Sequence, residues 1–245
     1  MRRLFIAALL IFFFSSLFAL TVTVKNSYAG LSEESQKQVD VFLKESDIYQ
    51  AVQKISNYAQ NSVSKSDECI LNVIAANIYE ELGNYSEAQK MYSLAASLLT
   101  ALNREEKTIP GLKSDDLKLA AGRCALCRGD YMTSEILLAM INQEKASEET
   151  KAKIKLYTVW GYLCKAENKE GLFEPVVLMK SYLELDSMKS VRSQLLLTLW
   201  LVTGEEVYAE KLKSDFPKSP EAAIVTNKAS VLPSPFYLLN CFQAD

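Results

Sequence analysis

The chain has 245 residues, of which 49% are hydrophobic and 23% charged, and this composition predicts one or two folded domains and excludes disorder. Eight glycines and six prolines supply few turns, so a β-sandwich or a β-barrel is disfavoured and helices are expected. The chain contains no histidine, which excludes a Ser-His-Asp triad and a zinc site bound by histidine.

The N-terminus is predicted to be an export signal. A basic start, Met1–Arg3, is followed by an almost uninterrupted apolar run, Leu4–Leu20. Ser27–Ala29 supplies small residues where a signal peptidase reads the chain, so we expect residues 1–29 to be removed and the protein to be periplasmic. If the signal is retained, residues 4–24 are long enough to anchor the protein in the inner membrane, with the helical domain in the periplasm.

The charge argues against nucleic acid as a partner. Residues 1–29 contain three basic residues and no acidic one, so their removal changes the net charge from −3 to about −6. Phosphate binding needs a basic face, and the sequence shows only short stretches of mixed charge. The glycines are too scattered for a phosphate loop or a dinucleotide fingerprint, so no cofactor is expected.

The rest of the chain is predicted to form antiparallel helix pairs. Apolar residues recur through Leu71–Leu82 at the spacing of one buried helical face. Gly83 ends this helix, and Asn84 followed by Glu87 predicts the N-cap of a second helix directly after it. A further pair is predicted before these helices, within residues 32–63.

Small and aromatic residues recur at similar positions along four of these pairs. They are Ala75-Ala76, Tyr79, Gly83–Tyr85, Ala88, Tyr92 and Ala95, then Ala121-Gly122, Ala125, Gly129–Tyr131 and Leu138, then Trp160-Gly161, then 195–202, Gly204 and Ala209. This pattern resembles the tetratricopeptide repeat (TPR), a unit of about 34 residues. Ser134 replaces the usual alanine, and Gly171 and Pro175 depart from the pattern in the third pair. The resemblance spans 32–232 and implies an all-α solenoid of antiparallel helix pairs, a TPR-like superhelix.

The sequence predicts where this stack of helices ends. Ser219-Pro220 is typical of an N-cap and first helical residue, which predicts a C-terminal capping helix running to about Ser230. We therefore expect one continuous domain over residues 30–232, interrupted most by the loop at 103–113. The apolar tail, residues 233–245, is expected to fold back on the last helices, with contact to a partner as the alternative.

Five cysteines leave at least one thiol unpaired in an exported chain: Cys69, Cys124, Cys127, Cys164 and Cys241. The Cys124–Cys127 spacing occurs in redox enzymes, but here it falls near a helix C-terminus, whose dipole opposes a thiolate. A metal site would need two more ligands without help from histidine. Cys124, Cys127 and Cys164 are expected to be small core residues, and a buried disulfide between neighbours is the alternative.

The TPR resemblance also implies a binding surface. In that family the first helices of the pairs line a concave groove, and the matching exposed positions here are Asn77, Arg123, Tyr162, Lys165, Gln194 and Thr198. Arg123 and Lys165 add positive charge and Tyr162 an aromatic anchor, so acidic or carboxyl-ended peptides are expected to fit.

The leading hypothesis is a non-enzymatic scaffold or adaptor of the bacterial cell envelope, which binds another envelope protein or peptide through this groove and needs no metal. An alternative is a periplasmic small-ligand-binding accessory of a transporter, which predicts a deep pocket near Trp160 and Tyr162. A third hypothesis is a thiol-disulfide enzyme that uses Cys124 and Cys127.

Overall fold

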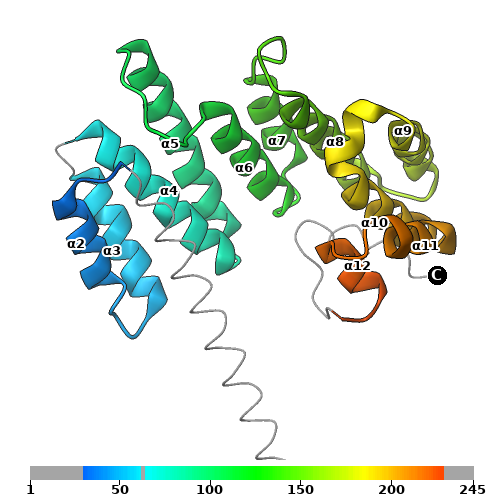
Figure 1. The fold of residues 1–245 in the computed structure, drawn as a ribbon, viewed down its shortest axis with the longest axis horizontal. Helices are drawn as coiled ribbons and strands as arrows, with labels where there is room; N and C mark the ends of the chain where they lie inside the picture. The colour runs from blue at the N-terminus through cyan, green and yellow to red at the C-terminus, as the bar shows by residue number, and fades with distance from the viewer. Residues whose placement is uncertain (1–29, 62–63, 229–245) are drawn as a thin grey trace, which may run out of the picture. The chain divides into compact units, whose positions relative to one another are not determined.

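The computed structural model describes residues 30–61 and 64–228 (Figure 1). The expected export signal and the apolar tail lie outside these residues. All regular elements in the described part are helices, which confirms the all-α prediction. None of the described helices combines the length and hydropathy needed to cross a membrane. The chain divides into two compact units at residue 117, within α6 (Ser114–Leu126).

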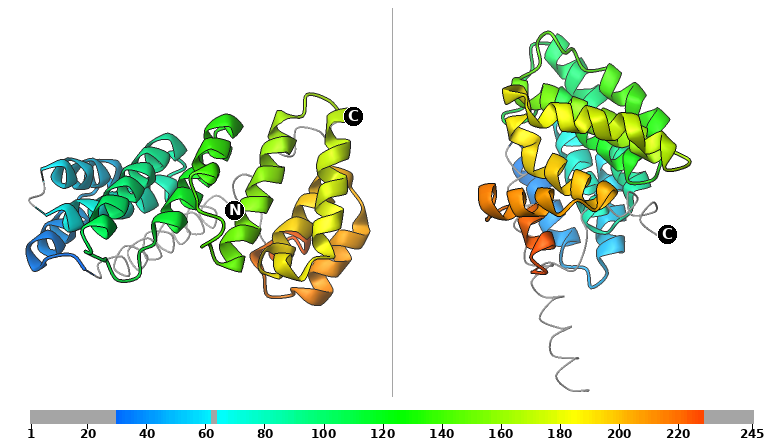
Figure 2. Two further views of the ribbon diagram at one scale, coloured as in Figure 1. Left: turned by 90° about the horizontal axis from the view of Figure 1, so that it is seen from above. Right: turned by 90° about the vertical axis from the view of Figure 1, so that its right-hand side faces the viewer.

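Among its described residues, unit 1 contains four complete helices, coloured blue to green in Figures 1 and 2. They are α2 (Glu33–Phe42), α3 (Ile48–Gln60), α4 (Lys65–Glu81) and α5 (Tyr85–Arg104). The helix α4 packs on both α3 and α5, so its apolar residues, including Leu71, Ile74 and Ile78, are fully buried. A helix covered on two sides forms the centre of the core of this unit.

One two-residue pattern ends a helix and starts the next in both units. Gly83 has φ +73°, and the backbone N–H of Asn84 donates to the carbonyl of Tyr79, which closes α4. The side chain of Asn84 then accepts from the N–H of Glu87 at 3.3 Å and caps α5, as predicted. Gly129 and Asp130 end α6 and cap α7 (Tyr131–Ala139) in the same way.

A buried carboxylate joins the first turns of α2 and α4. Asp67, which is 7% exposed, accepts from the Ser32 backbone N–H at 3.0 Å and the Ser32 hydroxyl at 2.5 Å. The buried Ser35 hydroxyl donates to the same carboxylate at 2.7 Å. Burial alone would raise the pKa of Asp67, but the hydrogen bonds from Ser32 and Ser35 outweigh it and hold the pKa below its ordinary value.

In the part of unit 2 that the structure describes, up to residue 228, α7 is followed by five further α-helices and two short 3₁₀ helices. They are α8 (Glu148–Lys165), η1 (Glu170–Leu172), α9 (Phe173–Leu183), η2 (Asp186–Val191), α10 (Arg192–Thr203), α11 (Glu206–Asp215) and α12 (Pro220–Val225). The helices α8 and α10 supply much of the core, to which η2 and α9 add Met188 and Met179. The indole N–H of Trp160 on α8 donates to the hydroxyl of Thr198 on α10 at 3.0 Å and links the two helices inside this core.

The C-terminal helix begins as predicted and ends earlier. Ser219 caps α12 by accepting from the N–H of Ala222 at 3.0 Å, and Pro220 is its first residue. The helix ends at Val225, short of the expected end near Ser230. Its termination has a local cause, because Asn227 has φ +55° and the next N–H, of Lys228, donates to the carbonyl of Ala223.

Candidate functional site

The predicted groove residues do not all share one environment. Asn77 belongs to unit 1, and the other five belong to unit 2. Asn77 is half-buried, and its Oδ1 lies 2.6 Å from the hydroxyl of Tyr92, which also lies 3.0 Å from Glu80 Oε2. This side chain therefore helps to hold α4 against α5. Arg123 and Gln194 are half-buried, and only Tyr162 and Lys165 are exposed.

Thr198 corrects the sequence-based expectation. It was predicted to be exposed on the groove, but it has 0% exposure. Its hydroxyl accepts from Trp160 Nε1 and donates to the carbonyl of Gln194 at 2.7 Å. The physical reason is that a buried indole N–H needs an acceptor, and Thr198 supplies one from the facing helix. Thr198 is therefore a core residue and is removed from the candidate site.

Tyr162 and Lys165 lie between two concave surfaces of unit 2. Tyr162 is 47% exposed near the C-terminal end of α8, and Lys165 follows it by one helical turn. Both residues line a small hollow between α7 and α8 and a larger groove between α8 and α9. We call these two residues, with the hollow and the groove that they line, the Tyr162 site.

The hollow is large enough for one amino-acid side chain. Its volume is about 120 Å³, and its walls include Tyr131, Leu138, Tyr157 and Gly161. For comparison, a protein cavity of about 150 Å³ accommodates benzene. Ser134 also lines the hollow, is buried, and has no hydrogen-bond partner for its Oγ among the described residues. A group entering the hollow could supply that partner.

Sequence reasoning missed Ser134 as a site residue. It was recognised only as a departure from the alanine that the repeat pattern expects. That departure was the available signal, because a hydroxyl at a position where helices pack closely must find a hydrogen-bond partner or remain unsatisfied.

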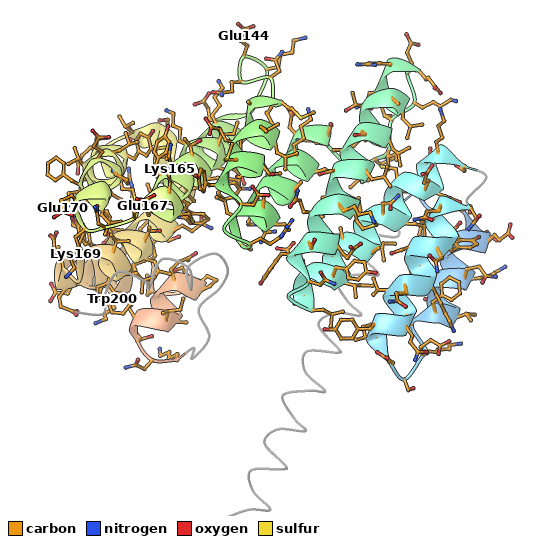
Figure 3. All side chains as sticks on the ribbon, turned by 180° about the vertical axis from the view of Figure 1, so that it is seen from behind. Glu144, Lys165, Glu167, Lys169, Glu170 and Trp200 are labelled. Atoms are coloured by element: carbon orange, nitrogen blue, oxygen red, sulfur yellow. The ribbon has the colours of Figure 1, made fainter. Side chains whose placement is uncertain are left out.

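The larger groove is open, with a volume of about 780 Å³. It is formed by Tyr162 and Lys165 at the end of α8, the segment after α8, and Gly171, Pro175 and Leu178 around α9. Figure 3 labels Lys165, Glu167, Lys169 and Glu170 in this part of unit 2. The segment is shaped partly by Asn168, whose Oδ1 accepts from the N–H of Gly171 at 2.9 Å.

The charges of the Tyr162 site are mixed. Lys165 shares the hollow with Glu135 and the groove with Glu167 and Glu174. Three carboxylates around one ammonium group do not make a basic surface. The site therefore does not favour the expected acidic peptide over other peptides, and shape and aromatic contact become its main sources of selectivity.

Four of the five cysteines lie within the described residues, and none of these four is exposed. Cys69, Cys124 and Cys127 are buried, and Cys164 is half-buried. Burial and the nearby Glu68 raise the pKa of Cys69 to about 12. Cys127 directly follows the C-terminal end of α6, where the helix dipole disfavours a thiolate. Within the described residues, no group of three or more potential metal ligands occurs.

The hollow and the groove both lie beside Tyr162, but neither reaches Trp160. Trp160 is buried and bonded to Thr198, and it lines neither the hollow nor the groove.

Comparison with known proteins gives a family match for the C-terminal part of the chain. A family model named TP_0752_M, and described as a middle domain, matches residues 164–242. The match covers less than half of the chain, and it begins near the end of α8. No curated protein and no solved structure is detectably similar to the chain. The helical structure is compatible with a repeat protein, but the matched family is a middle domain and not a TPR.

Proposed function

We propose that the protein is a non-enzymatic scaffold of the bacterial cell envelope, a TPR-like solenoid that holds a segment of another envelope protein at the Tyr162 site. The observation that carries this proposal is the exposed Tyr162 ring between a hollow for one side chain and an open groove. Tyrosine is enriched among the residues that dominate binding energy, because a rigid ring offers a large contact area.

In this proposal an extended segment of the partner lies along the α8–α9 groove and inserts one side chain into the hollow. Tyr162 packs against the segment where the groove and the hollow meet, and the Ser134 hydroxyl bonds the inserted group. The walls of the hollow are carried by α7 and α8, whose N-termini are capped by the side chains of Asp130 and Ser147, so little ordering is needed on binding there. The mechanism is the presentation of a preformed surface, with no chemical step.

The envelope location belongs to the same proposal. It is supported by the basic start, the apolar run and the small residues of positions 1–29. N-terminal sequencing of protein recovered from the periplasm is expected to begin at Gly30. Recovery of the intact N-terminus with the membrane fraction would instead support anchoring through residues 4–24.

A photocrosslinking amino acid at position 162 tests the binding proposal in living cells. The matched control is position 49, because Tyr49 is also about half exposed, at 49%, but lies on α3 in unit 1. We expect a discrete protein adduct from position 162 and not from position 49, identified by mass spectrometry. Adducts that are the same from both positions, or absent from position 162, would refute the proposal.

Two substitutions in the hollow then test its role. Gly161→Leu adds a side chain at the wall of the hollow, and we expect it to abolish the adduct at position 162. Ser134→Ala removes one hydrogen bond of about 1 kcal/mol, so we expect partner affinity to fall about fivefold. Unchanged binding in both variants would show that the partner does not enter the hollow.

The small-ligand accessory is the alternative function, and no contact in the described residues favours it over the scaffold. The hollow is smaller than the roughly 300–1,000 Å³ of typical small-molecule pockets, whereas the groove, at about 780 Å³, falls within that range but is open to solvent. Native mass spectrometry separates the two functions. A small molecule that accompanies the wild type and is lost in Tyr162→Ala, without any protein adduct, would replace the scaffold proposal.

A further inference from the structure

Unit 2 has a second open groove on the other side of α9, which the Tyr162 site does not use. It lies between the η1–α9 segment and the end of α10, and its volume is about 670 Å³. Its apolar walls include Leu172, Phe173 and Val176 on one side and Trp200 on the other. Phe173 is 72% exposed, and Trp200, labelled in Figure 3, is half-buried. We call this the α9–α10 groove.

We propose that the C-terminal segment 229–242 of the same chain occupies the α9–α10 groove. The first argument is the extent of the family match, which continues past Lys228 to residue 242. A family model that includes this segment treats it as part of the domain formed by α9–α12. All residues of the α9–α10 groove also fall within the match.

The Tyr162 site differs in this respect. Apart from Lys165, the walls of its hollow, from Tyr131 to Tyr162, lie outside the matched residues. A relative that carries only the matched region would therefore have both the C-terminal segment and the α9–α10 groove, but it would lack the hollow. The family match therefore includes the C-terminal segment together with the α9–α10 groove and without most of the hollow.

The chemistry of the segment fits the groove. Residues 229–244 contain no charged side chain, and Phe236–Leu239 and Phe242 are large and apolar. The groove has one lysine, Lys169, and one glutamate, Glu206, so it presents no net charge to the segment. Covering Phe173 and Trp200 with these residues would remove apolar surface from water, which favours this placement.

The geometry of α12 allows the segment to reach the groove. The helix α12 packs on α10 and α11, and the ends of these two helices that meet at Gly204 form one wall of the groove. Eight extended residues lead from Lys228 to Phe236 and span about 26 Å. That distance exceeds the length of α10, which has 12 residues and extends about 18 Å.

Tryptophan fluorescence of the full exported chain tests this placement. The chain has two tryptophans, and Trp160 is only 2% exposed, so changes in solvent access report on Trp200. The test variant is Leu238→Asp combined with Leu239→Asp, which introduces charge into the apolar segment. We expect its emission to shift to the red and its quenching by acrylamide to increase, because Trp200 becomes uncovered.

Two controls accompany the variant. Gln243→Asp adds a charge just beyond the matched residues and should leave the emission unchanged. In a Trp200→Phe background the Leu238→Asp, Leu239→Asp pair should also cause no shift, with circular dichroism confirming an unchanged helical fold.

Three outcomes would overturn the proposal. One is unchanged emission in the Leu238→Asp, Leu239→Asp variant. Another is an equal shift in the Trp200→Phe background, which would place the effect at Trp160. The third is a shift that depends on protein concentration and accompanies loss of a dimer in sedimentation, which would assign the groove to the segment of a second copy.

Discussion

Replacing Asp67 with alanine is expected to destabilise unit 1 at the junction of α2 and α4. The substitution removes the acceptor of three hydrogen bonds and leaves the buried hydroxyl of Ser35 and the backbone N–H of Ser32 without it. Each bond contributes about 1 kcal/mol once the cost of burying the carboxylate is subtracted, so the free energy of unfolding should fall by about 3 kcal/mol. Urea unfolding followed by circular dichroism near neutral pH measures it.

The pH dependence gives a second, independent readout. Because the pKa of Asp67 is lower in the folded protein than its ordinary value, its contribution to the free energy of unfolding is complete above about pH 4. The contribution is lost as the pH falls through the lower pKa of the folded state. The difference between wild type and Asp67→Ala should therefore stay constant from pH 7 to about pH 5 and shrink below about pH 4.

Glu81→Ala is the matched control for this prediction. It removes one carboxylate from the same helix, but at an exposed position near its C-terminal end. Equal unfolding midpoints for Asp67→Ala and Glu81→Ala would refute the reasoning. So would a difference between wild type and Asp67→Ala that grows on acidification, because that result requires a raised pKa. Hydrogen exchange in α2 should increase in Asp67→Ala alone, since α2 loses its contact with α4.

Three other predictions rest on single contacts. Gly204 ends α10 with φ +70°, so Gly204→Ala should lower the free energy of unfolding by about 1 kcal/mol. Gly161 lies inside α8, so Gly161→Ala should leave the free energy of unfolding unchanged or raise it by up to about 1 kcal/mol. Thr198→Val should lower the free energy of unfolding, measured in urea, by about 1–3 kcal/mol, because valine deprives the Trp160 indole N–H of its acceptor. Thr198→Ser keeps a hydroxyl at this position and should unfold near the wild-type midpoint. Cys69 should resist iodoacetamide near pH 8 in the folded protein and react once it is unfolded, as peptide mapping would show, because its pKa is raised to about 12.

The sequence predicted those features whose causes are local. Gly83-Asn84 ends one helix and caps the next through bonds within five residues, so the residue types alone identify it. The start of α12 at Ser219 was predicted for the same reason. Its end at Val225 was not, because it depends on Asn227 adopting a positive φ, which asparagine tolerates but does not require.

The missed features depend on residues far apart in the chain. Thr198 looks like an exposed polar position until Trp160, 38 residues earlier, faces it from α8. Asp67 looks like an ordinary acidic residue in a first helical turn, and its partners lie 32 and 35 residues away. For the candidate site, Tyr162 and Lys165 were predicted as exposed neighbours, but the carboxylates around Lys165 follow from the packing of α7 and α9 on α8.

The division of the chain at residue 117 has a consequence for the order in which the protein folds. Each unit is built from an uninterrupted stretch of chain, and α4 and α5 meet across a turn of three residues, 82–84. Contacts between neighbouring segments form quickly, since little loop entropy is lost. Unit 1 can therefore complete its core before unit 2 has folded. A chain truncated after α6 should retain a folded, protease-resistant unit 1.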